Sequence, residues 1–541
     1  MKDISSTGSF VDFTLENFIY VDKTVYIPQL VKLKRVFISR PRRFGKSLTL
    51  DTIATLFETG VEPYFKGTWI YDKWTEPTYP VLRLNFLNFD KNSLEKFNNK
   101  LNSKITEFAE LNQVTTYKEK VEAEDSIDHL LEQLRLEGRQ IVILIDEYDC
   151  QMTANINNET LYKQFQEKIK SFYANIKDKF AIKFLGITGV TRLKDVSIFS
   201  VGSDINDITN ASAYSQMIGF TRDEIKKYYI DYLKLASSYE NNCSVDDVTD
   251  TQLESMLDMM AQNYDGYCFD EDYEKKVFST WSVNKFFQTM IEKKKVQFGE
   301  YWYDNGGLPS ILVNYLKTHE LNIFEYLDKD KFLKVSSDDF KNPTALTTIN
   351  QNVLMCQTGY LTLRSDLNKT STVALGIPNG EIYKALNRLL ANNIFKGNTD
   401  ITDDYGRSLL EVGTVDDIIN LFNSALNSVS YDNYPIVSES SVQNMLKLYL
   451  LGAHQEVLSE VHEAKGRADL VVNTDNRRIV FEFKYAKNEA EAKSKLSEAV
   501  EQIKTRDYGN ILPKKNELIR IAAVFNADPK VRAFTENQIV P

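Results

Sequence analysis

Residues 40–47 read Arg40-Pro41-Arg42-Arg43-Phe44-Gly45-Lys46-Ser47 and lie between an expected strand, Val36–Ser39, and an expected helix, Lys46–Phe57. A loop that leads from a strand into a helix N-terminus offers backbone amides to phosphate oxygens, and the helix dipole favours that negative charge. The lysine of such a loop reaches the outer phosphates, and the next hydroxyl binds Mg²⁺. We therefore expect a binding site for ATP, with Ser47 as a magnesium ligand, formed by Arg43, Phe44, Gly45, Lys46, Ser47 and Leu48.

Arg40 departs from the usual phosphate-loop pattern, which has glycine at this position. Its side chain either forces a different loop shape or shows that the glycine is dispensable. Together with Arg42 and Arg43, it also concentrates positive charge beside the expected phosphates. The simpler alternative is a strand, a solvated basic turn and a helix that bind no ligand.

A second pattern favours the nucleotide interpretation. Asp146 and Glu147 directly follow the apolar run Ile141–Ile145, which lacks alternation and is typical of a strand covered on both faces. Charges at the carboxyl end of such a strand face the crevice where α/β sheets bind ligands. We expect Asp146 to hold Mg²⁺ through water and Glu147 to act as the catalytic residue that polarises the attacking water. Thr188, after the expected strand Lys183–Ile187, is predicted to sense the γ-phosphate.

The chain has 541 residues, which suggests roughly three domains of about 150 residues each. We expect an α/β domain with a mainly parallel sheet at residues 1–205, a helical middle region at 206–430 and a second α/β domain at 431–541. In the first domain the expected strands are Val36–Ser39, Val81–Phe86, Ile141–Ile145 and Lys183–Ile187, and the expected helices are Lys46–Phe57, Ser93–Leu111, Ser126–Leu136 and Glu159–Ile176.

In the middle region, capping boxes predict two helix starts, one at Thr221–Glu224 and one at Thr251–Glu254. Alternating residues on both sides of Ser365–Lys369 predict a hairpin. A helix followed by a hairpin indicates a winged-helix-like piece within this region.

Composition excludes several classes of protein. Hydrophobic residues make up 43% and charged residues 26%, which is typical of a soluble globular chain. The net charge of −11 excludes a protein coated in positive charge, so any nucleic-acid surface must be a local patch. Four scattered cysteines argue against a disulfide framework or a structural zinc site. No apolar run approaches the ~18 residues of a membrane span, and the N-terminal residues lack a secretory pattern, so we expect a cytoplasmic protein without membrane association.

A second metal site is expected near the C-terminal end. A short turn joins two expected strands as a hairpin that brings Asp469 beside Glu482. Alternation along the second strand puts Glu482 and Lys484 on one face. Two carboxylates suit Mg²⁺, with Glu460 as a further candidate ligand. Lys484 is then placed to orient the attacking water or to stabilise a pentavalent phosphate, although Asp…Glu-x-Lys patterns also arise by chance.

Several motifs together resemble one family. They are Tyr20-Val21-Asp22-Lys23-Thr24, Arg40–Ser47, Ile145-Asp146-Glu147-Tyr148-Asp149, Ile187-Thr188-Gly189-Val190, Phe199-Ser200, Gln357–Leu361 and Gly376–Asn379. With the C-terminal motif they resemble the AAA-ATPase-like proteins that carry a C-terminal PD-(D/E)xK nuclease-like domain. The resemblance implies a P-loop NTPase core with an inserted strand, followed by a nuclease-like α/β domain in which Asp469, Glu482 and Lys484 are the catalytic residues. That family also carries arginine at the position of Arg40, whereas Ala468 stands where the motif name has proline.

The leading functional hypothesis is an Mg²⁺-dependent ATPase whose nucleotide state controls a C-terminal nuclease acting on DNA or RNA. The alternative is a nucleotide-gated switch whose C-terminal domain binds nucleic acid or a protein partner without cleaving. A motor that assembles into rings ranks third, because Arg192 and Arg222 are only candidates for an arginine finger. An oligomer is compatible with the sequence.

Overall fold

The structure is a computed structural model that describes residues 1–177, 179–193, 204–302, 310–316, 319, 323–343, 345–395, 405–453, 456–463, 466–510 and 514–541. For residues 310, 405–407, 456 and 459–463 it describes the backbone only. The motif at Phe199-Ser200 and the side chain of Glu460 therefore lie outside the described part. The chain forms two compact units, one from Met1–His319 with Phe332–Ile382 and the other from Glu320–Lys331 with Tyr383–Pro541.

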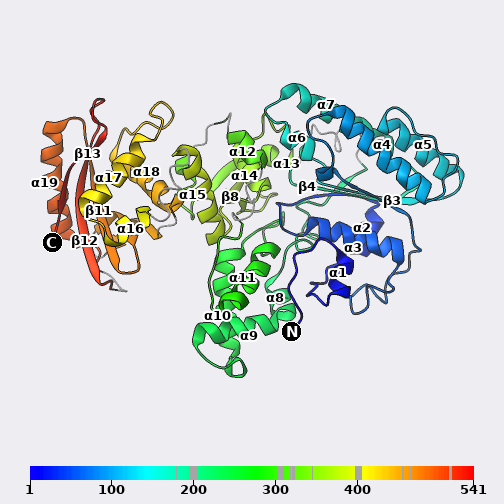
Figure 1. Cartoon of the computed structure of the whole chain (residues 1–541), viewed down its shortest axis with the longest axis horizontal. Coiled ribbons are helices and arrows are strands. Elements are labelled where there is room, and N and C mark those ends of the chain that lie inside the picture. Colours follow the sequence, from blue (N-terminus) through cyan, green and yellow to red (C-terminus); the bar gives the residue numbers. More distant parts are fainter. Residues whose placement is uncertain are drawn as a thin grey trace. The chain divides into compact units, whose positions relative to one another are not determined.

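The first unit begins with an α/β layer structure. Its elements are α1 (Phe10–Leu15), α2 (Ile27–Leu33), β1 (Arg35–Ser39), α3 (Lys46–Thr59), β2 (Val81–Asn85), α4 (Leu94–Leu111), α5 (Ala123–Leu136), β3 (Ile141–Asp146), α6 (Cys150–Ala154), α7 (Glu159–Ile176), β4 (Ile182–Gly189) and β5 (Asn206–Asp207). The strands are all parallel, in the order β2-β3-β4-β1-β5. Figure 1 shows α3 on one face of this sheet and α4, α5 and α7 on the other. The predicted parallel sheet is thus confirmed.

The order of the strands brings the expected site residues to one edge. Every residue of β3 is buried, as the apolar run predicts for a central strand. β4 lies between β1 and β3, and its register pairs Thr188 with Ile38 and Ile187 with Ile145. The carboxyl ends of β1, β3 and β4 therefore meet. β2, which separates β1 from β3 along the chain, lies at the edge of the sheet.

Helices dominate the middle of the chain. They are α8 (Arg222–Tyr228), α9 (Ile230–Asn241), α10 (Asp250–Tyr264), α11 (Thr280–Lys293), α12 (Ser310–Leu316), α13 (Ser337–Lys341) and α14 (Gln351–Gln357). Thr221 and Glu224 form the predicted capping box of α8. The second predicted box is wrong by two residues. Thr249 is the N-cap of α10, and the side chain of Gln252 accepts a hydrogen bond from the backbone N–H of Thr249. Thr251 therefore lies inside the helix.

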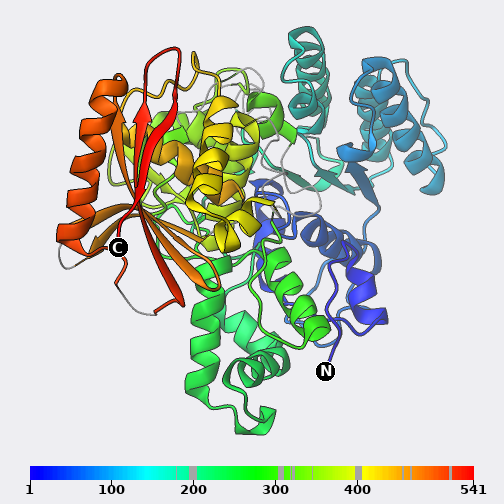
Figure 2. The ribbon, with the colours of Figure 1, turned by 60° about the vertical axis from the view of Figure 1, so that its left-hand side comes forward.

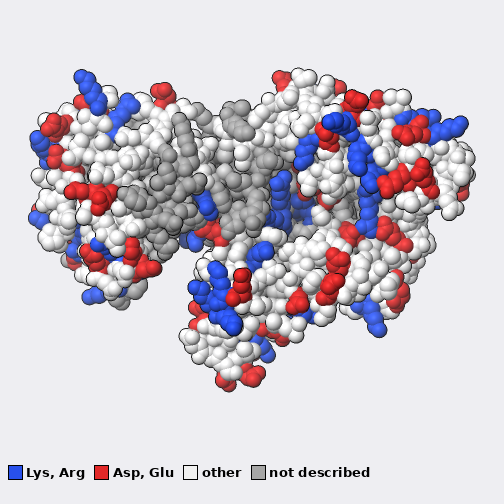
Figure 3. Space-filling view, viewed as in Figure 1, with Lys and Arg blue, Asp and Glu red and all other residues white. Residues whose placement is uncertain are grey.

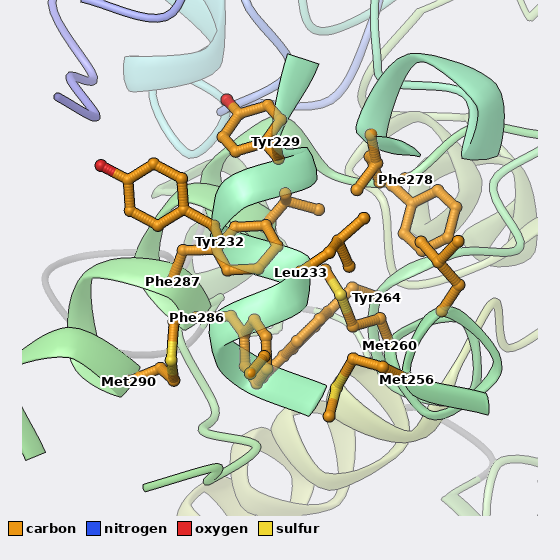
Figure 4. Packing of buried hydrophobic residues seen from close by; sticks show 14 of the residues in the cluster. Tyr229, Tyr232, Leu233, Met256, Met260, Tyr264, Phe278, Phe286, Phe287 and Met290 are labelled. Carbon is orange, nitrogen blue, oxygen red and sulfur yellow. The ribbon is translucent and has the colours of Figure 1, made fainter. Parts of the chain in front are cut away.

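The core of these helices is aromatic and rich in methionine. Figure 4 shows Leu233 of α9, Met260 of α10 and Phe287 of α11 in one cluster, which also includes Tyr229 from between α8 and α9. The same cluster includes Ile19 and Val21 of the N-terminal segment. Burial of this apolar surface therefore holds the N-terminal segment against the helices.

A small antiparallel sheet completes the first unit. Its strands β6 (Leu333–Ser336), β7 (Thr362–Leu363) and β8 (Thr372–Gly376) lie in the order β6-β8-β7. The predicted hairpin is confirmed as β7 with β8, and α14 precedes it. The third strand, β6, was not predicted from the sequence.

The second unit is a mixed α/β structure entered through α15 (Gly380–Ile394). Its further elements are α16 (Tyr405–Val412), α17 (Val415–Asn427), α18 (Glu439–Gly452), β9 (Glu456–Glu463), β10 (Gly466–Asn473), β11 (Arg477–Ala486), α19 (Glu489–Arg506), β12 (Glu517–Asn526) and β13 (Ala533–Ile539). The strands follow the order β13-β12-β11-β10-β9, and only the β11–β12 pair among them is parallel. Sequence reasoning missed β13.

Alternation along β11 assigns its residues to the two faces of this sheet. Val480 packs with Ala499 and Ile503 of α19, which covers one face in Figure 2. Phe481 packs against Phe422 of α17, on the other face. Glu482 therefore shares the α19 face with Val480, because side chains two residues apart point the same way. The hairpin of β10 and β11 is as predicted.

One buried carboxyl group stands apart from the predicted sites. Glu381, in the first turn of α15, is 2% exposed and accepts hydrogen bonds from Ser282 Oγ at 2.7 Å and from the backbone N–H of Trp302 at 2.7 Å. Burial raises the pKa of Glu381 to about 8. The folded state therefore holds a proton that the unfolded chain releases above about pH 4.5.

We predict that Glu381→Gln removes a pH-dependent loss of stability. The folded-state pKa is raised, so wild-type stability falls as the pH rises from about 4.5 to about 8. The amide keeps the size of the side chain and accepts from Trp302 while donating to Ser282. Thermal unfolding of the full chain is expected to show a higher midpoint for the variant at pH 9 and little difference at pH 5. An equal difference at both pH values would contradict this assignment.

Candidate nucleotide site and candidate nuclease site

Three side chains meet at the carboxyl edge of the parallel sheet. Ser47 Oγ donates to Asp146 Oδ2 at 2.6 Å, and Thr188 Oγ1 donates to Asp146 Oδ1 at 2.5 Å. The backbone N–H of Glu147 also donates to Asp146 Oδ1, at 3.0 Å. A hydroxyl and a carboxylate side by side are the hard oxygen donors that Mg²⁺ prefers, so the residues present fit a magnesium ion.

The phosphate loop has the backbone expected at a helix N-terminus. Gly45 is the N-cap of α3 and has a φ of +102°, a left-handed conformation that favours glycine. A Cβ at this position would meet no atom within 4 Å, so the backbone conformation, and not lack of space, is the reason for glycine here. Lys46 is 4% exposed, and its Nζ donates to the carbonyls of Arg40 at 3.0 Å and Pro41 at 3.1 Å. Backbone carbonyls of the loop therefore accept hydrogen bonds from the ammonium group of its own lysine.

Glu147 lies close to that lysine. Its Oε1 is 3.8 Å from Lys46 Nζ, and its φ of +52° is unusual for a residue other than glycine. Burial raises the pKa of Glu147, while the charge of Lys46 opposes the rise. A carboxylate with a raised pKa is a better proton acceptor near neutral pH.

A cavity of about 370 Å³ opens beside the loop. Its lining includes all six loop residues predicted to bind nucleotide, Arg43 through Leu48, together with Glu147. Asp146 and Thr188 are joined to it through Ser47. The opposite walls come from Ser5–Gly8, Ile19–Val21, Met217–Phe220 and Tyr229. Sequence reasoning missed these walls, because no local motif links residues so far apart along the chain.

Arg40 points away from this cavity. Its guanidinium is 1% exposed, donates to the carbonyls of Ser39 at 2.9 Å and Thr209 at 2.6 Å, and lies 4.2 Å from the ring centroid of Phe269. Burial lowers the pKa of Arg40 to about 9, so the side chain stays charged at neutral pH. The residue that replaces the usual glycine thus binds the end of β1 to the middle region.

Arg43 and Phe44 line the cavity but are also anchored outside the loop. Arg43 Nη1 donates to the carbonyl of Tyr301 at 2.8 Å, and the guanidinium lies 4.7 Å from the Trp281 ring centroid. Phe44 is 1% exposed and packs edge-to-face against Tyr267, with the ring centroids 4.7 Å apart. These contacts fix the loop from the side of the helices.

The second predicted site lies on the α19 face of the C-terminal sheet. The backbone N–H of Phe483 donates to Asp469 Oδ2 at 2.9 Å, which holds Asp469 against β11. Lys484 Nζ donates to Glu482 Oε1 at 2.9 Å. Burial, and then the charge of Asp469, raise the pKa of Glu482 to about 7. The structure thus brings Asp469, Glu482 and Lys484 together.

A third carboxylate at this site was missed from the sequence. Glu439, in the first turn of α18, lies 3.3 Å from Lys484 Nζ. Its charge also raises the pKa of Asp469, after the larger effect of burial. No sequence signal beyond a capping box at Ser438 marks this helix start. Glu460, the predicted further ligand, has its backbone in β9 and its side chain outside the described part.

The acidic residues at this site do not form a ready-made metal centre. Within the described ranges, no group of three or more His, Cys, Asp or Glu side chains is placed to hold a metal ion. However, Glu482 Oε2 is buried and has no hydrogen-bond partner among the described residues. An orphaned carboxylate oxygen beside a second carboxylate fits a cation, because leaving such an atom unpaired costs free energy.

A basic residue lies at the edge of the same site. Arg506, in the last turn of α19, interacts electrostatically with Glu482 and Asp469 and donates to Tyr508 Oη at 2.9 Å. Gln502 Nε2 lies 3.5 Å from the same hydroxyl. Elsewhere, Figure 3 shows basic and acidic side chains intermixed on the face in view.

Comparisons with known proteins bear on both sites. Residues 5–199 match the family described as "Predicted AAA-ATPase", and residues 437–535 match the PD-(D/E)XK nuclease superfamily. The chain joins an AAA-ATPase-like domain to a PD-(D/E)XK nuclease-like domain. The predicted family resemblance is therefore confirmed.

The chain is similar over nearly its full length to one curated protein. This is the "Uncharacterized protein in vnfD 5'region" of Azotobacter chroococcum, which is 26% identical over 533 residues, covering 95% of this chain and 94% of that protein. Among solved structures, a Walker-type ATPase of Pyrococcus abyssi aligns at 11% identity and a TM-score of 0.36, covering 67% of this chain and 94% of that one. The ORC2 protein of Aeropyrum pernix aligns at 11% identity and a TM-score of 0.28, covering 68% and 91%.

Among the helices that the structure describes, none combines the length and the apolar character needed to span a bilayer.

We predict that Arg40 stabilises the ATPase-like domain whether or not a nucleotide is bound. Arg40→Ala removes three hydrogen bonds from a charged donor and a buried cation–π contact, for an expected loss of roughly 3 kcal/mol in the free energy of unfolding. The matched control is Arg42→Ala, two residues away and half-buried, which is expected to change that free energy by less than about 1 kcal/mol. Urea unfolding of both full-length variants measures the difference, and equal midpoints would refute the anchoring role.

Proposed function

We propose that this protein is an Mg²⁺-dependent ATPase whose nucleotide state controls a metal-dependent nuclease domain acting on DNA or RNA. The observation that carries the proposal is the presence, in one chain, of two separate side-chain clusters whose oxygen donors suit a divalent ion. The first contains Ser47, Asp146 and Thr188, and the second contains Asp469, Glu482 and Lys484. The family of each domain agrees with this assignment.

In the ATPase-like domain, the amides at the start of α3 bind the phosphates of ATP. Lys46 exchanges its bonds to the loop carbonyls for bonds to the outer phosphates. Ser47 and Asp146 would hold a magnesium ion, which would neutralise charge on the β- and γ-phosphates. Glu147 accepts a proton from the attacking water, and Thr188 holds Asp146 in place. The walls formed by Ile19–Val21 and Met217–Phe220 enclose the base.

In the nuclease-like domain, Asp469 and Glu482 are the residues that would hold the metal. A divalent ion held by these two carboxylates would lower the pKa of a water and neutralise charge on the scissile phosphate. Lys484, released from Glu482, orients that water or stabilises the pentavalent phosphate. Arg506, at the edge of this site, binds an adjacent phosphate of the strand.

A second function, nucleotide-gated binding without cleavage, is favoured by one observation. Lys484 Nζ contacts both Glu482 and Glu439. Its ammonium group therefore occupies the position beside Glu482 where cleavage would require a metal ion. In that case the C-terminal domain binds nucleic acid or a protein partner. Cleavage assays decide between the two functions.

We predict that the two sites can be inactivated separately. Lys46→Ala is expected to lower ATP hydrolysis by at least about 100-fold, because the main cation of the phosphate site is lost. Glu482→Ala is expected to abolish phosphodiester cleavage and leave ATP hydrolysis unchanged. The measurement offers full-length protein a mixture of labelled single- and double-stranded DNA and RNA, with Mg²⁺ or Mn²⁺, with and without ATP.

The outcomes separate the two functions. Wild-type protein that hydrolyses ATP and binds nucleic acid in an ATP-dependent way, but cleaves nothing with either metal, supports the switch. Wild-type protein that neither hydrolyses ATP nor cleaves nucleic acid overturns the ATPase–nuclease proposal.

We further predict a role for Glu439, the carboxylate that sequence reasoning missed. Glu439→Gln removes one of the two negative partners of Lys484 and is expected to lower Mg²⁺-dependent cleavage by about 10-fold or more, as for residues that orient metal ligands. Glu489→Gln is the matched control, because Glu489 is exposed in the first turn of α19 and pairs only with Lys493 among the described residues. Equal cleavage rates for the two variants would exclude Glu439 from the site.

A further inference from the structure

We propose that Arg42 is a catalytic residue of ATP hydrolysis that supplies, from within the same chain, the cation that an arginine finger supplies elsewhere. This inference rests on the proposed ATPase function and goes beyond it by assigning a residue that neither the motif nor the family description assigns. It follows from what the three arginines of the loop do in the fold.

Two of the three arginines are held by the middle region. The guanidinium of Arg40 is buried against Thr209 and Phe269, and it faces a separate small cavity beside Cys268. The guanidinium of Arg43 is held by the Tyr301 carbonyl and the Trp281 ring. Both guanidinium groups are therefore engaged with residues of the middle region.

Arg42 differs from both of its neighbours. It is half-buried, and no hydrogen bond or ion pair joins its side chain to another residue in the described parts of the chain. It lines the 370 Å³ cavity together with Lys46, Ser47 and Glu147. The guanidinium of Arg42 and the carboxylate of Glu147 therefore border the same cavity.

The reaction needs a second cation at this place. Transfer of the γ-phosphoryl group spreads negative charge over its oxygens, and an arginine that stabilises this charge contributes about 10³-fold or more. Lys46 alone supplies positive charge from the helix start. The two arginines that the sequence offered as fingers are engaged elsewhere, Arg192 with Asp207 and Arg222 with Glu254 and Asp258.

The step itself balances without any further reactant. The water oxygen forms a bond to the γ-phosphorus as the bond from that phosphorus to the β–γ bridging oxygen breaks, which releases ADP and phosphate. The water proton passes to Glu147. Arg42 donates hydrogen bonds to the γ-phosphoryl oxygens and thereby stabilises the charge that develops in the transition state.

The experiment compares Arg42→Ala, Arg42→Lys and the control Arg222→Ala in the full-length protein with Mg²⁺. We expect Arg42→Ala to lower kcat for ATP hydrolysis by about 10³-fold, while the Kd for ADP changes by less than about threefold, because ADP lacks the γ-phosphate. Arg42→Lys restores charge but not the planar donor pair, so an intermediate kcat is expected. Arg222→Ala is expected to hydrolyse ATP at the wild-type rate.

Mixing variants distinguishes action within one chain from action between chains. An equimolar mixture of Arg42→Ala and Lys46→Ala is expected to stay inactive, because each site lacks a residue of its own chain. Recovery of ATP hydrolysis in the mixture overturns the proposal, since it shows that Arg42 acts on a neighbouring copy.

The remaining outcomes are equally decisive. An Arg42→Ala variant with wild-type kcat overturns the role of Arg42 and leaves the proposed ATPase function intact. A variant that loses ADP and ATP binding alike also overturns it, because Arg42 would then hold the loop or the nucleotide and not the transition state. Wild-type protein without ATP hydrolysis overturns both this inference and the proposed function.

Discussion

A buried guanidinium holds the phosphate loop in place. Arg40 carries its charge into the interior, where two carbonyl oxygens and the face of Phe269 replace the water it loses. Phe44 and Arg43 add an aromatic and a polar contact to the same region. The loop is thus attached to the middle region as well as to its own strand, and both belong to one compact unit.

This attachment decides which charges face the nucleotide cavity. Arg40 is turned away from the cavity and Arg43 is held by the Tyr301 carbonyl, whereas Lys46 and Arg42 line the cavity beside Glu147. The walls of the cavity come from the N-terminal segment and from the region that leads into α8, which share the aromatic core of the helices. Packing of that core therefore sets the shape of the cavity, although the residues proposed to act on ATP are not part of the core.

Both sites handle the cost of buried carboxylates in the same way. Lys46 lies 3.8 Å from Glu147, and Lys484 lies 2.9 Å from Glu482. In each pair burial raises the pKa of the carboxyl group, and the neighbouring ammonium opposes the rise. A buried charge without such a partner is strongly destabilising. Each lysine therefore already lies next to the carboxylate with which it is proposed to act.

Local sequence was enough to predict the parallel sheet, most helices, the C-terminal hairpin and the grouping of Ser47 with Asp146. Hydrophobic period, caps and loop motifs depend on residues close together in the chain, and strand ends in a parallel sheet meet at a common edge. Folding alone decided the direction of Arg40, the cavity walls and the position of Glu439 beside Lys484. Each of these depends on contacts between residues far apart in sequence, whose free energy is set by packing and burial and leaves no local pattern to detect.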